Sequence, residues 1–141
     1  MTSRDELITH LSELTLPLMW TLRQDAMRAF EALGVRPVKA LLLAFIARGM
    51  QHPKDLAEVL DTVPPTVSAM LAELEDAGHV TRQIDPSDRR RVCLTLTPQG
   101  EALSAQLKDA WLAAGRERAR VLSTDELGAL VTTYRKLVNL S

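Results

Sequence analysis

Apolar residues recur every three or four positions along most of the chain, which is the spacing of one face of an α-helix. The first such stretch runs from Asp5 to Leu33. Pro17 lies inside it, and because proline has no N–H to donate to the preceding turn, we expect it to kink or split this helix. Gly34 ends the stretch, and Pro37 opens a second helix that stops near Gly49.

Two short helices follow, each opened by proline: one at Pro53 and one at the Pro64–Pro65 pair, which Gly78 ends. The second of them carries an apolar stripe at i, i+3, i+4 and i+7, predicted to be buried and formed by Val67, Met70, Leu71 and Leu74. Its opposite face should point outward and carries Thr66, Ser68, Ala69 and Glu73.

After Gly78 the apolar period changes from 3.6 to 2, which predicts a two-stranded hairpin. The alternating apolar positions are Val80 and Ile84 in the first strand and Val92, Leu94 and Leu96 in the second. The segment between the strands begins with Asp85-Pro86-Ser87-Asp88, which has turn-forming residues, and three arginines follow at once.

Two long helices complete the chain. Thr97 and Pro98 form an N-cap and a first helical position, and nearly heptad apolar spacing follows. Ser123 and Glu126 form a capping box that opens a last amphipathic helix.

Length and composition narrow the class of protein. With 141 residues, 46% hydrophobic and 25% charged, the chain fits one globular domain. Its longest apolar run, Ala40–Ala47, is far shorter than the about 20 residues of a membrane span, and no secretory signal opens the chain, so we expect a cytoplasmic protein. The single cysteine, Cys93, excludes an internal disulfide, and we expect no metal site and no cofactor.

The order of elements is typical of a winged helix-turn-helix, an arrangement whose geometry suits duplex DNA. A helix about 10–12 Å across fits the major groove, and a thin arginine-bearing hairpin fits the narrower minor groove. The net charge of −1 gives no sign of a nucleic-acid partner, but residues 82–91 hold four arginines against two aspartates, a local charge of +2.

The stretch from Asp55 to Gly100 closely resembles the MarR family of transcription regulators, and the resemblance extends over nearly the whole chain. The family's wing carries Asp-Arg-Arg near its tip, which falls here on Asp88, Arg89 and Arg90. The resemblance implies that Arg89 enters the minor groove while Asp88 and Arg90 pair to hold the shape of the wing.

The resemblance also implies a homodimer whose interface uses Asp5–Leu16 and Trp111–Leu140, and which represses transcription by binding pseudo-palindromic DNA. The predicted fold class is mainly α with a small β-hairpin wing: a winged helix-turn-helix with N- and C-terminal dimerisation helices. It forms a single domain over residues 1–141, with the winged core at about 35–97 and dimerisation helices at about 5–33 and 98–140.

The predicted DNA contacts lie on the wing and on the recognition helix, which extends from Pro64 to Ala77: Pro65, Thr66, Ser68, Ala69, Arg82, Asp88, Arg89, Arg90 and Arg91. The helix itself has no Lys or Arg, and residues 53–78 hold Lys54 against six acidic residues, a local charge of −5. We therefore expect modest, salt-sensitive binding through the wing, the free N–H groups at the helix start and two hydroxyl groups. The competing interpretations are a solvated arginine run and hydroxyls that only cap the helix.

A candidate effector site combines arginines with aromatic and sulfur-containing side chains, a chemistry that suits a small aromatic acid: Met19, Trp20, Arg23, Phe45 and Arg48. The alternative is that the apolar members of this set are core residues. Cys93 is interpreted as a small strand residue rather than an oxidant sensor, and His10, His52 and His79 as scattered surface or packing groups.

Two other functions compete with DNA binding. The acidic recognition helix allows a winged-helix protein-interaction module that has lost operator binding, against which the wing arginines argue. An enzyme is the weakest alternative, since the sequence shows no nucleophile–base pair, metal set or glycine-rich phosphate loop.

Overall fold

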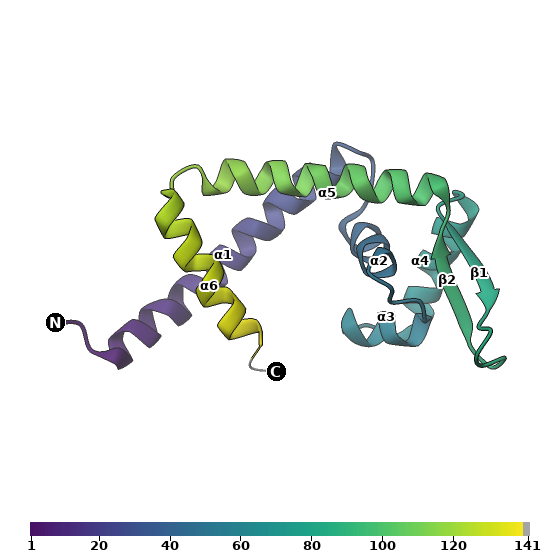
Figure 1. The fold of residues 1–141 in the computed structure, drawn as a ribbon, viewed down its shortest axis with the longest axis horizontal. Coiled ribbons are helices and arrows are strands. Elements are labelled where there is room, and N and C mark those ends of the chain that lie inside the picture. Colours follow the sequence, from purple (N-terminus) through teal and green to yellow (C-terminus); the bar gives the residue numbers. More distant parts are fainter. Residues whose placement is uncertain (140–141) are drawn as a thin grey trace.

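The computed structural model describes residues 1–139, and within them the chain forms six helices and one hairpin. The elements follow the predicted order, as Figure 1 shows: α1 (Arg4–Glu31), α2 (Pro37–Ala47), α3 (Pro53–Val59), α4 (Pro64–Asp76), β1 (Val80–Ile84), β2 (Val92–Leu96), α5 (Pro98–Ala119) and α6 (Thr124–Val138). Leu140, the predicted end of the last helix, lies outside the described residues. No helix in residues 1–139 combines the length and apolar character needed to cross a bilayer.

α1 is one uninterrupted helix of 28 residues, so the alternative in which Pro17 splits it is wrong. Proline removes one helical hydrogen bond, to the carbonyl group four residues earlier, and its ring crowds that same carbonyl group. Both Pro17 and Glu13 are exposed, so water can satisfy that carbonyl. Before the proline, α1 is fixed by a capping box in which Ser3 and Glu6 each accept a backbone N–H bond from the other.

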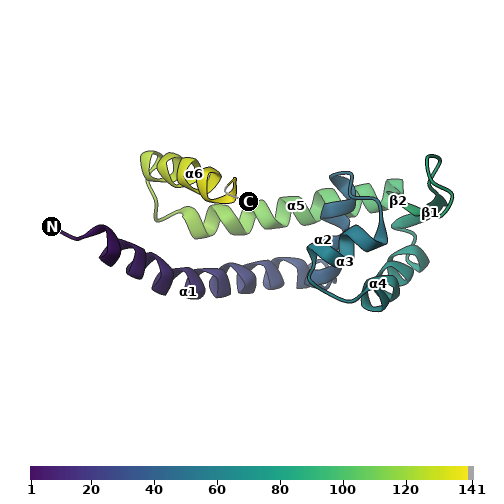
Figure 2. The ribbon, with the colours of Figure 1, turned by 90° about the horizontal axis from the view of Figure 1, so that it is seen from below.

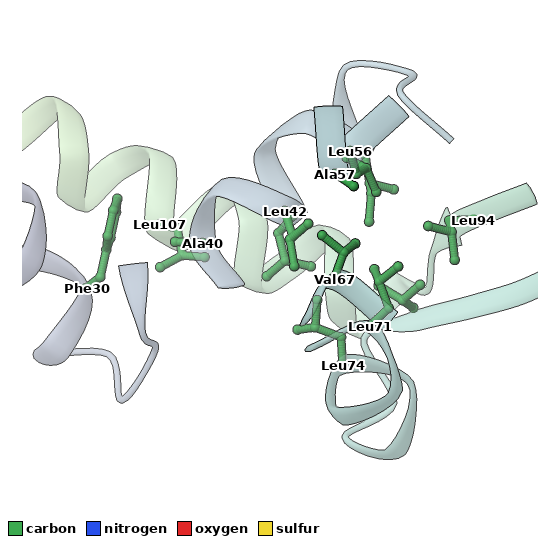
Figure 3. Packing of buried hydrophobic residues seen from close by; sticks show 13 residues of the cluster. Phe30, Ala40, Leu42, Leu56, Ala57, Val67, Leu71, Leu74, Leu94 and Leu107 are labelled. Atoms are coloured by element: carbon green, nitrogen blue, oxygen red, sulfur yellow. The ribbon is translucent and has the colours of Figure 1, made fainter. Parts of the chain in front are cut away.

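The core lies where α2, α3, α4 and the hairpin meet, and Figure 3 shows its side chains interdigitating. Leu42 and Leu43 of α2 are fully buried at its centre. The predicted stripe of α4 packs onto them, with Val67, Leu71 and Leu74 buried and Met70 partly buried. Burial of these side chains fixes the orientation of α4, and therefore which of its residues face outward.

The hairpin pairs Val80 with Leu96 and Ile84 with Val92 in antiparallel register. Its inner end is anchored, since Val80 and Leu94 are buried, whereas Ile84 is 68% exposed near the wing tip. The wing therefore extends from the core into solvent, as Figure 1 shows.

A tight junction joins the hairpin to α5. The Thr97 hydroxyl donates to the carbonyl oxygen of Gly78 at 2.5 Å and accepts the N–H of Gly100 at 3.0 Å. Gly100 packs so closely on the preceding turn that a Cβ atom there would lie 1.9 Å from the carbonyl oxygen of His79. The start of α5 is therefore fixed directly against the turn that ends α4.

The helices outside the winged core form an open frame, seen in both views (Figures 1 and 2). α1 and α5 pack together where Phe30 stacks on Trp111, with 6.3 Å between ring centroids, and they diverge toward the N-terminus of α1. Arg118 of α5 donates to both carboxylate oxygens of Asp25 at 2.8 and 2.9 Å, and this pairing lowers the pKa of Asp25. α6 buries none of its described residues.

Candidate nucleic-acid interface

The outward face of α4 presents free hydroxyl groups. Pro65, Ser68 and Ala69 are exposed and Thr66 is half-buried. No hydrogen bond within residues 1–139 involves the hydroxyl of Thr66 or Ser68, and the N-cap residue, Val63, makes no side-chain bond. The capping interpretation of these two hydroxyls is therefore wrong, and both are available to an external partner.

The backbone at the start of α4 lacks the free N–H groups that the sequence predicts. Pro64 and Pro65 have no N–H group, and the N–H groups of Thr66 and Val67 donate to the carbonyl oxygen of Val63 at 3.1 and 3.4 Å. The prediction that free N–H groups here bind phosphate is therefore wrong. Contacts from α4 must come from side chains.

Hydrogen bonds within the wing turn fix its shape. Asp85 donates its N–H to the carbonyl oxygen of Arg91 at 3.0 Å, and its carboxylate accepts the Ser87 N–H and hydroxyl at 2.8 and 2.7 Å. Asp88 accepts the backbone N–H of Arg90 at 3.0 Å, and these two side chains form no ion pair. The predicted pairing of Asp88 with Arg90 therefore holds only through the backbone of Arg90, which leaves its guanidinium unengaged.

The four arginines of the predicted site fall into two groups. Arg82 pairs with Glu75 of α4 at 3.0 Å, and Arg91 pairs with Asp55 of α3 at 3.5 Å. These two side chains connect the wing to the helix-turn-helix. Arg89 and Arg90 are exposed at the tip and make no ion pair within the part of the chain that the structure describes. The free positive charge of the wing is therefore concentrated on these two residues.

The fold also compensates most of the acidic charge around α4. Glu73 pairs with Arg36 at 2.9 Å and with Lys39, and the hydrogen bond from Lys39 is the main reason why the pKa of Glu73 is lowered. Adding these two cations of the α2 region and the paired wing arginines changes the local charge from −5 to −1. Arg36 and Lys39 lie outside residues 53–78, so they do not enter the charge of −5 that the sequence predicts for this segment.

A further residue missed as part of the site is His52, the N-cap of α3. Its Nδ1 atom lies 2.9 Å from the carbonyl oxygen of Val92, and its Nε2 atom lies 3.3 Å from Asp85 Oδ2. Next to it, the N–H of Leu94 donates to the carbonyl oxygen of Gln51 at 2.7 Å. The residues just before α3 are therefore hydrogen-bonded to β2 at one end of the wing turn and lie within ion-pair distance of Asp85 at its other end.

The predicted effector residues lie on two helices. Met19 and Trp20 of α1 are 61% and 59% exposed, so they are not core residues in this chain. The Arg23 guanidinium lies 5.8 Å from the Trp20 ring centroid, a cation–π contact. Phe45 packs on the core from α2, and Arg48 is exposed at its end.

No hydrogen bond, ion pair or ring contact among residues 1–139 joins these α1 residues to those of α2, and the effector site stays a prediction. One open cavity of about 630 Å³ lies between α1 and α5, and another of about 440 Å³ lies between α2, β2 and α5. Neither cavity is lined by any of the predicted effector residues.

Comparison with known proteins assigns the family. A model described as "MarR family" matches residues 33–91. A putative transcriptional regulatory protein for the hcr operon of Thauera aromatica is 30% identical over 117 residues, covering 82% of this chain and 70% of that protein. The transcriptional repressor MdtR of Bacillus subtilis is 28% identical over 126 residues, covering 87% and 78%. These relatives are named as regulators of transcription and not as enzymes.

Solved structures confirm the winged helix-turn-helix fold. The apo form of MarR from E. coli superposes with a TM-score of 0.75 at 22% identity, covering 97% of each chain. A point mutant of S. aureus MepR, bound to an oligodeoxyribonucleotide, superposes with a TM-score of 0.63 at 24% identity, covering 91% of this chain and 95% of that one. The sequence matches these regulators over most of the chain, and the fold matches theirs over nearly all of it. The chain therefore belongs to the MarR family of transcriptional regulators.

Proposed function

We propose that the protein is a sequence-specific DNA-binding repressor that acts as a homodimer in the cytoplasm. The observation that carries the proposal is that Arg89 and Arg90 make no ion pair within residues 1–139 and lie exposed on a wing that the Arg82–Glu75 pair joins to α4. The DNA-bound MepR structure and the name of the repressor MdtR support the same function.

In the proposed complex, α4 and the wing contact different parts of the DNA. α4 enters the major groove, where Thr66 and Ser68 donate to base edges or phosphate oxygens. Arg89 enters the adjacent minor groove, whose negative potential attracts a guanidinium group. Arg90 contacts the phosphate backbone, so part of the binding free energy comes from released counterions and depends on salt. Arg82 and Arg91 hold the wing and make weaker contacts or none.

The proposed homodimer is supported by apolar side chains that the single chain leaves in solvent. On α1 and α6 these include Leu7, Leu11, Leu14, Leu127, Leu130, Val131, Tyr134 and Leu137, each 39% or more exposed. Helix faces that expose this many large apolar side chains are typical of an interface between proteins. Two-fold pairing through them places two copies of α4 on half-sites one DNA turn apart.

Replacing Val131 by aspartate should shift the protein from dimer to monomer, because two charges would be buried at a two-fold interface. Val59→Asp is a matched control, since Val59 of α3 has the same side chain and 45% exposure against 46% for Val131. Sedimentation equilibrium should give twice the 15.6 kDa chain mass for the wild type and the control, and a dissociation constant raised at least about tenfold for Val131→Asp. An unchanged dimer in both variants would exclude α6 from the interface.

A small aromatic acid bound between Trp20, Arg23 and Arg48 is the effector that we propose, with its carboxylate on an arginine. Such a ligand acts only if it favours the conformation in which the two α4 helices no longer match the half-site spacing. The competing function, a protein-interaction module, loses support because two of the three acidic residues of α4, Glu73 and Glu75, are paired with basic side chains.

The test of the proposal is DNA binding measured by fluorescence anisotropy over a salt series. The probes are duplexes from the promoter region of the protein's own gene and a shuffled duplex of the same length and base content. We expect preferential binding to one promoter duplex, with an affinity that falls linearly on a logarithmic salt scale. Equal affinity for promoter and shuffled duplexes at every salt concentration would contradict sequence-specific regulation.

A further inference from the structure

The root of the wing holds a histidine between two hydrogen-bond acceptors. His52 Nδ1 faces the Val92 carbonyl oxygen at 2.9 Å, and His52 Nε2 faces Asp85 Oδ2 at 3.3 Å. Asp85 directly follows β1 and Val92 begins β2, so the two acceptors lie on either side of the turn that carries the free arginines. Both side chains are largely enclosed, with 20% of His52 and 11% of Asp85 exposed.

Neither acceptor can act as a donor to the ring. A carbonyl oxygen has no hydrogen, and Asp85 stays ionised because hydrogen bonds from the Ser87 hydroxyl and N–H lower the pKa of its carboxyl group. A neutral imidazole has one N–H group and can serve only one of these acceptors, whereas an imidazolium has two and serves both. The arrangement of partners therefore fits the protonated ring.

We propose that His52 is a positioning residue for DNA binding, whose imidazolium form bonds the α2–α3 segment to both ends of the wing turn and so sets where Arg89 and Arg90 point. The inference rests on the proposed function, since it takes DNA as the ligand of those arginines. Loss of the ring proton leaves one end of the turn without its bond, and the tip then moves more freely.

The other connections at this root do not change with pH near neutrality. The charged groups at the junction are Asp85 of the wing and the Arg91–Asp55 pair, which joins the end of the wing turn to the first turn of α3. Arginine and aspartate are residue types whose ordinary pKa values lie outside the range from pH 5 to pH 8. The bond from the Leu94 N–H to Gln51 is between backbone groups. Histidine is the residue type whose ordinary pKa lies between pH 5 and pH 8.

The expected consequence is a DNA affinity that falls as the pH rises. Between pH 6 and pH 8 the wild type should lose about threefold more affinity than His52→Gln, a size typical of partly exposed pairs. Glutamine keeps a polar side chain with a donor but has no charge to lose. His79→Gln is the matched control, since His79 is a half-buried histidine just before β1 that makes no side-chain bond within residues 1–139.

The experiment combines anisotropy titrations on promoter DNA at pH 6 and pH 8 with ¹⁵N relaxation of the Arg89 and Arg90 amides in the free protein. We expect these amides to be more ordered at pH 6 in the wild type and His79→Gln, and equally mobile at both values in His52→Gln. Equal pH profiles of order and affinity in the wild type and His52→Gln would overturn the inference. A wing whose order depends on His52 in a protein that shows no preference for promoter DNA would support the positioning role and contradict the proposed function.

Discussion

Replacing Arg89 by alanine should lower the affinity for promoter DNA at least about tenfold, the largest effect that we expect from any single wing residue. Its guanidinium is exposed and has no partner within residues 1–139, so alanine removes a DNA contact without breaking an internal one. A direct arginine contact contributes about 1–3 kcal/mol, and a two-fold dimer loses it twice. Anisotropy over a salt series should also give a shallower slope, and the thermal midpoint should not change.

Arg120→Ala is the matched control, because Arg120 at the end of α5 is 72% exposed and, within residues 1–139, pairs with Glu117 alone. Since Arg120 lies in the predicted dimer stretch Trp111–Leu140, sedimentation equilibrium must show that this variant dimerises like the wild type. It removes the same charge far from the wing, so it should leave the affinity within about twofold of the wild type. Comparable losses in Arg89→Ala and Arg120→Ala would mean that only the total charge matters and that the wing tip makes no specific contact.

Replacing Gly100 by alanine should destabilise the fold by about 3 kcal/mol or more, at the upper end of what overpacking costs. The added Cβ atom would meet the carbonyl oxygen of His79 at 1.9 Å, and this is a backbone atom that cannot rotate away. The same contact lies beside the two Thr97 hydroxyl bonds that link the start of α5 to the turn at Gly78, so relief of the clash would also break them. Denaturant unfolding followed by circular dichroism measures the loss.

Gly115→Ala controls for the intrinsic preference of the helix. Gly115 lies in the same helix α5, and a Cβ atom there would meet nothing within 4 Å in the chain. Alanine is favoured over glycine inside a helix by up to about 1 kcal/mol, so this variant should be as stable as the wild type or more so. If the free energy of unfolding of Gly100→Ala equalled that of Gly115→Ala, the close approach of Gly100 to His79 would have no energetic importance.

Most of the fold could be predicted from the sequence because the helices and strands of the winged core bury apolar residues at the period of their own secondary structure. The stripe Val67, Leu71 and Leu74 specifies both the existence and the rotation of α4, so the outward position of Thr66 and Ser68 follows from the pattern alone. The shift to alternation after Gly78 likewise places the wing and its arginines.

The electrostatics of the candidate site could not be predicted in the same way. Arg36 and Glu73 are 37 residues apart, and His52 lies 40 residues from Val92, so only the packing of α2 and α3 against α4 and the hairpin brings them together. A count of charges along residues 53–78 therefore exaggerated the acidity of the interface. The prediction of free N–H groups at the start of α4 failed for a local reason. The two prolines do begin the helix, but each of them also lacks an N–H group.

The exposure of α6 implies that DNA binding depends on the concentration of the protein itself. It is a helix of 15 residues that buries no side chain in its own chain, and an isolated helix of this length is only marginally stable in water. In the proposed dimer, its order is linked by mass action to the encounter of two copies. Operator occupancy should then rise with the square of the chain concentration when copies are few, so a small change in expression would switch the promoter sharply.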